Sequence, residues 1–441
     1  MINKETHSPS KKKTISLFHD HVSSGKTKFF QSYGMDFVMG RREGPFLWDK
    51  DGKKRLFNLH NNGGVFNLGH RNEEIVDVLK SSLDEWDIGN HHLLSTARAD
   101  LANLLSKLMP DDLTYTVFGA SGGESVDLAI KVARSYTGHP KIISAVGSYH
   151  GHTGLAMATG DKKYREPFGP QLPGFQQVPF GDIEALSSAL GSDTAAVILE
   201  TVPATLGIRI PTLDYIQSVR RLCSQKKTLL ILDEVQTGLG RTGKLWGFEH
   251  YGIVPDMVIL GKGLSGGIYP ITATVIRKPL ESVFHKDPFI HISTFGGSEL
   301  GCRVAQRVLE ISSQPAFLDR INRLAERFAE GIGMLMDKHS GFLLGLRQLG
   351  LMMGLKFSED ICGPLVTKTA YDSDLLLIYA NNDTSVCQFL PPLVMEDDDV
   401  DWVVAQMDKA IATARRLKPI LKAKRTMSRF KNSLRKEAEG K

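Results

Sequence analysis

Residues 228–267 contain the two segments that decide the fold. The first, 228-TLLILDEVQTGLGRTGK-244, has a run of branched apolar residues that ends in Asp233 and Glu234. The second, 256-DMVILGKGLSGG-267, has a similar run that ends in Lys262 among glycines. Short apolar runs of this kind are typical of strands buried on both faces, and ligands of open α/β sheets bind at the carboxyl ends of such strands. The two segments therefore predict neighbouring strands that present an acid pair and a lysine at one edge of a sheet.

Similar runs recur along the chain and indicate an α/β fold. They lie at residues 141–145, 196–199, 229–232, 257–260 and 271–276, between longer helix-like stretches, which predicts a mainly parallel sheet with helices on both faces.

The length of the chain, 441 residues, exceeds what one hydrophobic core usually serves. We therefore expect a large domain at residues 71–313 and a smaller α+β domain at residues 314–441, which the N-terminal segment 1–70 joins. Within that segment, residues 45–58 predict a hairpin in which Asp51 and Gly52 supply the positive φ angles of a tight turn.

The composition is that of an ordinary globular protein, with 41% hydrophobic and 23% charged residues. The longest apolar runs are far shorter than the roughly 20 residues that span a bilayer. The polar N-terminus does not resemble a secretory signal. Cys223, Cys302, Cys362 and Cys387 lack the spacing of a disulfide framework or a zinc site, so we interpret them as reduced thiols. A cytoplasmic location without a membrane partner is expected.

Much of the formal net charge of +5 comes from the tail at residues 415–441. Its lysines and arginines suit either a solvated helical end or an arm that binds phosphates. No aromatic stacking pattern accompanies the charge, so the solvated end is favoured and a nucleic-acid partner is not expected.

Part of the first segment also resembles a nucleotide-binding loop. Gly238, Gly243 and Lys244 match most of a phosphate loop, and the acidic strand end resembles the magnesium-binding strand of an ATPase. However, Leu245 stands where such a loop needs Ser or Thr. The loop also follows the acidic strand directly instead of opening the first βα unit. Nucleotide binding is therefore disfavoured.

Lys262 is the strongest candidate for a catalytic group. A lysine in a tight glycine-rich turn can be desolvated, which lowers its pKa and prepares it for a Schiff base. For this segment alone, an ordinary surface lysine in a loop is the alternative. Asp233 argues against that alternative, because it is expected on the adjacent strand end. There its carboxylate can pair with a protonated pyridine nitrogen and keep the ring an electron sink.

A phosphate-binding turn is predicted at the start of a helix. The run 118-FGASGGE-124 places Ser121, Gly122 and Gly123 before a helical stretch at residues 125–136. Small residues in this position leave backbone N–H groups free to bind an anion with help from the helix dipole.

Tyr149 follows another predicted strand and offers an aromatic ring to stack on a pyridine face. The neighbouring His150 and His152 are possible metal ligands. No acidic or cysteine partner lies nearby at ligand spacing, so a metal site is not expected.

Taken together, these segments resemble the class III aminotransferases, a subgroup of the fold type I enzymes that use pyridoxal 5′-phosphate (PLP). The resemblance extends from about residue 33 to residue 407. It implies that Lys262 binds the cofactor covalently and later moves protons, and that Asp233 pairs with the pyridine nitrogen. It also implies the remaining cofactor contacts. Gln236 would contact the ring hydroxyl, and Tyr149 would stack on the ring face with His150 beside it. Ser121, Gly122 and Gly123 would hold the phosphate, and Glu200 stands at the position of the family's acidic gate residue.

The resemblance further implies a homodimer. Thr294, in 293-STFGG-297, matches the threonine that reaches the PLP phosphate bound by the partner subunit. A small-molecule amine is the expected substrate.

Three positions depart from the family pattern. After Glu200 the chain reads Thr-Val-Pro-Ala, where the family usually has a glycine, and Ser298 replaces an asparagine. Gln388 replaces the arginine that normally precedes a Pro-Pro-Leu motif and clamps the carboxylate of glutamate or a 2-oxo acid. A neutral amide cannot replace a bidentate charged pair. Arg209 or Arg347 is the alternative source of this contact.

Two reactions fit this pattern. An aminotransferase moves an amino group from a primary amine to a 2-oxo acid and needs the carboxylate clamp. A lyase of a small amino-alcohol phosphate or phosphonate, such as 2-amino-1-hydroxyethylphosphonate, releases an aldehyde and ammonia without any oxo acid. Gln388 therefore favours the lyase slightly. A non-catalytic regulator is disfavoured, because every expected cofactor residue is present.

Overall fold

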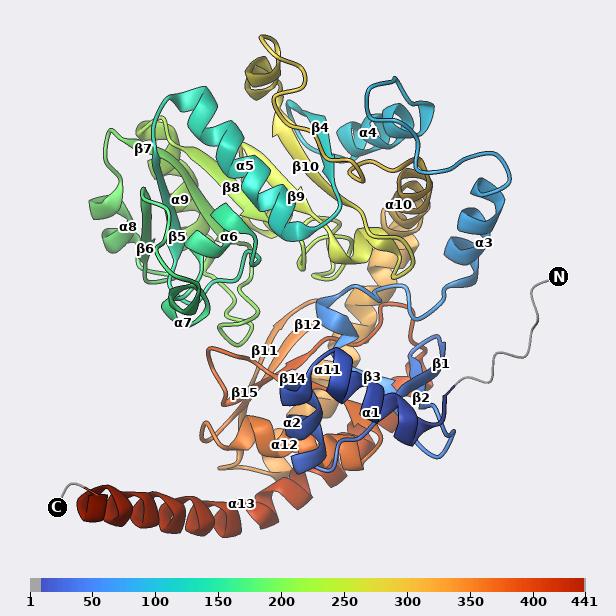
Figure 1. Ribbon diagram of the computed structural model, residues 1–441, viewed down its shortest axis with the longest axis vertical. Coiled ribbons are helices and arrows are strands. Elements are labelled where there is room, and N and C mark those ends of the chain that lie inside the picture. Colours follow the sequence, from blue (N-terminus) through green and yellow to red (C-terminus); the bar gives the residue numbers. More distant parts are fainter. Residues whose placement is uncertain (1–8, 440–441) are drawn as a thin grey trace.

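The computed structural model describes residues 9–439, with side chains up to residue 423. Its large domain is built on a seven-stranded sheet in the order β4-β10-β9-β8-β7-β5-β6 (Figure 1). The strands are β4 (Leu113–Gly119), β5 (Lys141–Ala145), β6 (Phe175–Val178), β7 (Thr194–Glu200), β8 (Leu229–Asp233), β9 (Met257–Leu260) and β10 (Thr272–Arg277). The five strands β9, β8, β7, β5 and β6 are parallel to one another, whereas β10 is antiparallel to its two neighbours, β9 and β4. The predicted α/β fold with a mainly parallel sheet is confirmed.

Helices cover both faces of this sheet, which explains why its strands are apolar at successive positions. Along β7, Val197 and Leu199 belong to the core under one layer of helices, and Ala196 and Ile198 belong to the core on the other side. The first layer contains α4 (Thr96–Leu108), α8 (Ile183–Ala189), α9 (Leu213–Gln225) and α10 (Glu299–Ser312), while α5 (Gly122–Thr137) and α6 (Gly154–Thr159) lie on the opposite face. The helix α3 (Glu73–Ser82) packs against α10 and buries Ile75 in the first core, and the one-turn helix α7 (Lys162–Arg165) follows α6.

The smaller domain combines both ends of the chain (Figure 1). One of its sheets has the order β1-β2-β3-β13, so three N-terminal strands pair with a C-terminal one. The strands of this sheet are β1 (Met39–Glu43), β2 (Phe46–Asp49), β3 (Arg55–Asn58) and β13 (Leu375–Leu376). A second sheet contains, in spatial order, β11 (Leu343–Leu349), β12 (Met352–Phe357), β15 (Val386–Phe389) and β14 (Ile378–Tyr379). The helices are α1 (Lys11–His21), α2 (Ser24–Ser32), α11 (Pro315–Lys338), α12 (Cys362–Asp372) and α13 (Asp397–Glu439).

The run that resembles a nucleotide-binding loop instead joins the two domains. The fully buried guanidinium of Arg241 donates hydrogen bonds to the carbonyl oxygens of Leu351 (3.1 Å) and Pro391 (2.7 Å) and to Asn67 Oδ1 (2.6 Å). Glu234 is also buried, and its carboxylate accepts bonds from the Thr201 hydroxyl and from backbone N–H groups. Both side chains are thus occupied in holding the fold together.

The predicted hairpin at residues 45–58 forms from β2 and β3, but its turn differs from the expected one. Gly52 has a φ of +73°, whereas Asp51 is not among the residues with positive φ. The expectation of positive φ at both turn residues was therefore wrong, because a longer connection lets Asp51 keep an ordinary conformation.

The predicted basic tail continues α13, whose last turns project away from the small domain (Figure 1). Lys418 and Lys422 each form a 2.6 Å ion pair with Glu359. From residue 424 onward, the tail lies outside the residues whose side chains are described. Among the described helices, none combines the length and apolar character that a membrane span requires.

Candidate active site

A cavity of about 440 Å³ lies at the carboxyl ends of β7 and β8, where Glu200 and Asp233 are register partners. Its walls include nine of the ten residues predicted from the sequence: Ser121, Gly122, Gly123, Tyr149, His150, Glu200, Asp233, Gln236 and Lys262. The other lining residues are Gly151, His152, Thr153, Val202, Val235 and Thr237. Parallel strands bring these distant segments together because their carboxyl ends share one edge of the sheet.

Lys262 lies directly after β9 in a short turn. Its φ of +43° is uncommon for a side chain other than glycine, so the surrounding loop must hold it in place. The ammonium nitrogen Nζ donates a 2.8 Å hydrogen bond to Gln236 Oε1. Burial lowers the pKa of Lys262, against the opposing charges of Asp233 and Glu200. A lowered pKa favours the neutral amine, which is the nucleophilic form.

Asp233 and His150 form a buried pair. Asp233 Oδ2 lies 2.8 Å from His150 Nδ1, and Oδ1 accepts a 3.1 Å bond from the backbone N–H of Val235. Burial disfavours the charged imidazole, but the hydrogen bond to Asp233 and the charges of Asp233 and Glu200 outweigh this effect, so the pKa of His150 is raised. The pair fixes the Asp233 carboxylate at the wall of the cavity.

Glu200 is 8% exposed, and no cation among the described residues is in hydrogen-bond contact with it. Its Oε1 accepts a 2.8 Å bond from the Tyr149 N–H, and its Oε2 accepts a 3.4 Å bond from the Ala204 N–H. Burial raises the pKa of Glu200 to about 7; His150 and Lys262 lower it and Asp233 raises it. This carboxyl group therefore changes its charge near neutral pH.

The start of α5 fits a phosphate group. Ser121 caps the helix by accepting a 3.3 Å bond from the Glu124 N–H, and Gly122 and Gly123 follow with bare backbone at the cavity wall. A Cβ atom at Gly123 would lie 2.7 Å from Thr153 Oγ1, so a larger residue would crowd the wall here. A helix of this length presents free N–H groups and a favourable dipole to an anion.

Other atoms of the cavity fit the pyridine ring of PLP. The buried atoms Gln236 Nε2 and His150 Nε2 have no hydrogen-bond partner among the described residues, and such atoms call for a polar ligand. Gln236 offers a donor to a ring oxygen, Asp233 an acceptor for a ring nitrogen, and Tyr149 an aromatic face. Together with the phosphate-binding turn, these groups would hold PLP with Lys262 at its reactive end.

The sequence analysis missed the loop at residues 60–64. A Cβ atom at Gly63 would lie 3.2 Å from Lys262 Cε, so this loop borders the lysine directly. His60 is close enough that burial and the charge of Lys262 lower its pKa to about 4. The sequence signal that could have identified this loop is the run Asn61-Asn62-Gly63-Gly64. All four residues have positive φ, a conformation that Asn and Gly tolerate best.

Four other predicted residues lie outside this cavity. Thr294 is exposed in the loop before α10. Arg347 Nη1 donates to the Gly207 carbonyl (2.6 Å) and forms an ion pair with Asp383 (3.4 Å), and the Arg209 guanidinium lies 6.0 Å from the centre of the Phe180 ring. Gln388 is 8% exposed on β15, and neither arginine lines the cavity.

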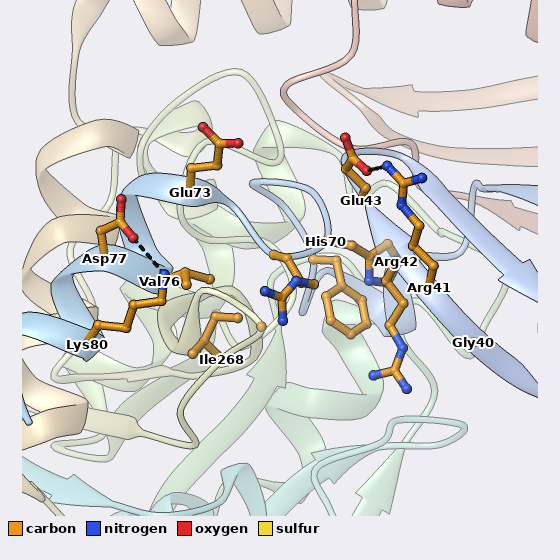
Figure 2. Close-up of a pocket in the computed structure, with 13 residues that line it drawn as sticks. Gly40, Arg41, Arg42, Glu43, His70, Glu73, Val76, Asp77, Lys80 and Ile268 are labelled. Carbon is orange, nitrogen blue, oxygen red and sulfur yellow. Dashed lines mark hydrogen bonds and ion pairs between the residues drawn. The ribbon is translucent and has the colours of Figure 1, made fainter. Parts of the chain in front are cut away.

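A larger cavity of about 830 Å³ lies between β1, α3 and residues 267–268 (Figure 2). Four of its charged side chains form ion pairs with each other: Arg41 with Glu43, and Lys80 with Asp77 at 3.2 Å. None of the predicted cofactor residues lines it. We therefore place the chemistry in the smaller cavity, which contains Lys262.

Comparisons with known proteins identify the family of the chain. The family model for class-III aminotransferases matches residues 30–411. An uncharacterized aminotransferase of Archaeoglobus fulgidus is 54% identical over 92% of this chain and 95% of its own length. Among solved structures, a thermostable (S)-enantioselective ω-transaminase from Thermomicrobium roseum is 26% identical, covers 92% of this chain and 99% of its own, and has a TM-score of 0.83.

A solved ornithine aminotransferase from Toxoplasma gondii, described with partial occupancy of PLP at its active site, is 25% identical with a TM-score of 0.81. It covers 91% of this chain and 98% of its own. The cofactor is therefore PLP, in agreement with the residues of the cavity. The chain belongs to the class III aminotransferase family.

Proposed function

We propose that the protein is an aminotransferase that moves an amino group from a primary amine to a 2-oxo acid. The observation that carries this proposal is the position of Lys262, whose desolvated Nζ lies in one cavity with Asp233, Gln236 and the phosphate-binding turn. The similarity to an aminotransferase at 54% identity supports the same reaction type.

Bound PLP supplies the carrier for the amino group and the electron sink for the proton transfer. The chain supplies the groups around it. Lys262 Nζ holds the cofactor and afterwards moves the proton next to the amine, because its lowered pKa makes the neutral base available. Asp233, oriented by His150, keeps the ring nitrogen protonated. Gln236 positions the ring and Lys262 together.

The lyase hypothesis finds no support. It rested on Gln388 and required a phosphate or phosphonate to be recognised. The phosphate-binding turn is assigned to PLP, and Lys262, the only lysine or arginine that lines the cavity in the described part of the chain, is assigned to the same cofactor. No cation of the cavity therefore remains to bind a second phosphate or a phosphonate.

Amine turnover with and without an oxo acid tests this function. The holoenzyme is incubated with a primary amine, with and without pyruvate, and aldehyde, alanine and ammonia are measured. We expect aldehyde and alanine in equal amounts, and no more than one aldehyde per active site without pyruvate. Many turnovers with ammonia release and no oxo acid would instead establish a lyase.

We also propose that the protein acts as a homodimer in which Thr294 reaches the partner's PLP phosphate. The loop that contains Thr294 and the loop before α4 both carry exposed apolar side chains: Phe289, Ile290, Ile292 and Phe295 in the first, and Leu93 and Leu94 in the second. The loops touch, since the His92 and Phe289 rings are 5.2 Å apart. A concentration of exposed apolar groups is typical of a protein interface.

The four buried free thiols agree with a cytoplasmic location.

Substitutions at these loops separate the two parts of the dimer proposal. Leu94→Asp is expected to shift the mass from dimer to monomer in light scattering, because it places a charge within the apolar surface. Leu344→Asp, at an exposed leucine on β11, serves as control.

Thr294→Ala is expected to raise the Kd of PLP about tenfold, since one hydrogen bond to a charged group is lost. A Leu94→Asp protein that remains a dimer, or unchanged PLP affinity in Thr294→Ala, would contradict the proposal.

A further inference from the structure

We propose that the larger cavity, between β1, α3 and residues 267–268, binds a small molecule that carries a phosphate group, through Arg42 and Arg71 (Figure 2). Its volume is about 830 Å³, against about 440 Å³ for the cavity that contains Lys262. Cavities of this size accept ligands larger than a single small ion. No residue lines both cavities, so the proposed site is separate from the one assigned to PLP.

Four segments that are distant in the sequence form the walls of this cavity. They are residues 40–43 of β1, the loop at residues 66–71, the helix α3, and residues 267–268. An isolated antiparallel bridge joins the loop to the N-terminal segment, where Gly44 and His70 exchange backbone hydrogen bonds of 2.7 and 3.0 Å. Arg42 and Arg71 lie within two residues of this bridge, which therefore brings both of them to the same cavity.

The charges of the cavity leave two arginines without a carboxylate. Its lining contains four basic and three acidic side chains, and the ion pairs within β1 and within α3 account for two of each sign. Arg42, Arg71 and Glu73 remain. In the described part of the chain, neither arginine has a carboxylate within ion-pair distance. Figure 2 shows the Glu73 carboxylate directed away from Arg42, so the cavity keeps an excess of positive charge.

Two unpaired guanidinium groups favour a ligand with several anionic oxygens. Each guanidinium presents a planar fork of N–H donors that binds a phosphate in a bidentate manner. Beside them, the ring of His70 lies 4.0 Å from that of Phe66, measured between ring centres. His70 adds no positive charge near neutral pH, because burial and the charge of Arg42 lower its pKa to about 4. The wall thus offers cations to a phosphate and ring surface to an organic group attached to it.

The backbone of Arg71 also supports a binding role. Its φ of +52° lies in the left-handed region, which is unfavourable for residues other than Gly, Asn and Asp. Backbone conformations of this kind are concentrated at binding and catalytic sites, where the surrounding structure holds them. Here the bridge between Gly44 and His70 holds the backbone directly before Arg71.

Titration calorimetry of the holoenzyme with pyrophosphate, in a buffer without divalent metal ions, tests the site. Bound PLP occupies the phosphate-binding turn of the other cavity. We expect a Kd of about 1 mM or lower, the affinity of two or three charge-assisted hydrogen bonds. Absence of binding at about ten times this concentration overturns the proposal. Adenosine 5′-monophosphate and inorganic phosphate then show whether the site prefers an ester or the free ion.

Arg42→Gln and Arg71→Asn are the test variants. Each removes one guanidinium group, so the Kd of pyrophosphate should rise about tenfold or more. Asparagine tolerates a positive φ, so Arg71→Asn should keep the Tm of the wild type or exceed it, which separates loss of binding from loss of the fold. Wild-type affinity in both variants would contradict the assignment of the site.

Two controls separate a formed site from general attraction by surface charge. Arg221→Gln, at an exposed position on α9, makes the same change in net charge outside the cavity. The double substitution Arg41→Gln and Glu43→Gln removes an ion pair of the cavity wall without a change in net charge. Both proteins should bind pyrophosphate like the wild type. A loss of affinity in either control as large as that in Arg71→Asn overturns the proposal.

Chemical modification gives a second readout that needs no variant. Phenylglyoxal reacts with exposed guanidinium groups, and mass spectrometry of peptides gives the rate at each arginine. Pyrophosphate should slow the modification of Arg42 and Arg71, which are both exposed, and leave the rate at Arg221 unchanged. Equal rates with and without pyrophosphate at the two cavity arginines would show that the ligand binds elsewhere.

Discussion

Replacing Lys262 with alanine is expected to lower kcat by about 10²- to 10⁴-fold or more, which is the contribution of a positioned proton-transfer group. The substitution removes both the nucleophile that holds PLP and the base that moves the proton. After borohydride reduction of the loaded wild-type protein, mass spectrometry should find the cofactor on the peptide that contains Lys262. The same treatment should leave Lys262→Ala unlabelled.

The control for this experiment is Lys244→Ala, in the loop that resembles a nucleotide-binding motif. Lys244 is exposed and its Nζ donates a 3.2 Å bond to the Glu249 carbonyl, outside the cavity. This variant should keep its activity and its labelled peptide. Substantial turnover in Lys262→Ala, or label on another lysine, would show that the cavity around Lys262 is not the active site.

Replacing Gln388 with arginine is expected to improve the use of 2-oxoglutarate as acceptor by about tenfold or more, the value of one charge-assisted contact. The side chain is 8% exposed on the face of β15 that packs toward the loop after Glu200. A guanidinium at this position would supply the carboxylate contact that the family resemblance expects here.

Gln388→Met separates the effect of charge from that of side-chain length. Methionine is similar in size but neutral, so it should leave the use of 2-oxoglutarate at the wild-type level. The comparison uses kcat/KM for 2-oxoglutarate and for pyruvate with one amine donor. If Gln388→Arg folds, as judged by its PLP content, and gains nothing with 2-oxoglutarate, the carboxylate contact is made elsewhere.

The strands of the large sheet were predictable because their residues face two apolar layers. Residues 141–145 and 257–260 match β5 and β9, and the other predicted runs differ by one or two residues at their ends. β4 and β6 were not predicted, since their polar and half-exposed positions break the apolar run. The antiparallel direction of β10 was also not visible, because direction depends on the connection and not on the residues of a strand.

The structure brings nine predicted cofactor residues to one cavity, but it also adds residues that no local pattern identified. Gly63 borders Lys262 although the two are far apart in sequence, because the N-terminal loop packs on the turn after β9. The absence of Arg209 and Arg347 from the cavity likewise became evident only when their carbonyl, carboxylate and aromatic partners were known.

The sequence by itself determined the α/β fold and the enzyme family, and it predicted nine residues of the cavity, because these depend on short motifs with a fixed local geometry. Its preference for a lyase came from one missing arginine, a difference that has no meaning without the surrounding charges. Only the tertiary structure showed that the cavity is lined by acids and a single lysine. Electrostatic character is a sum over residues from distant segments, so it is decided by their arrangement in space.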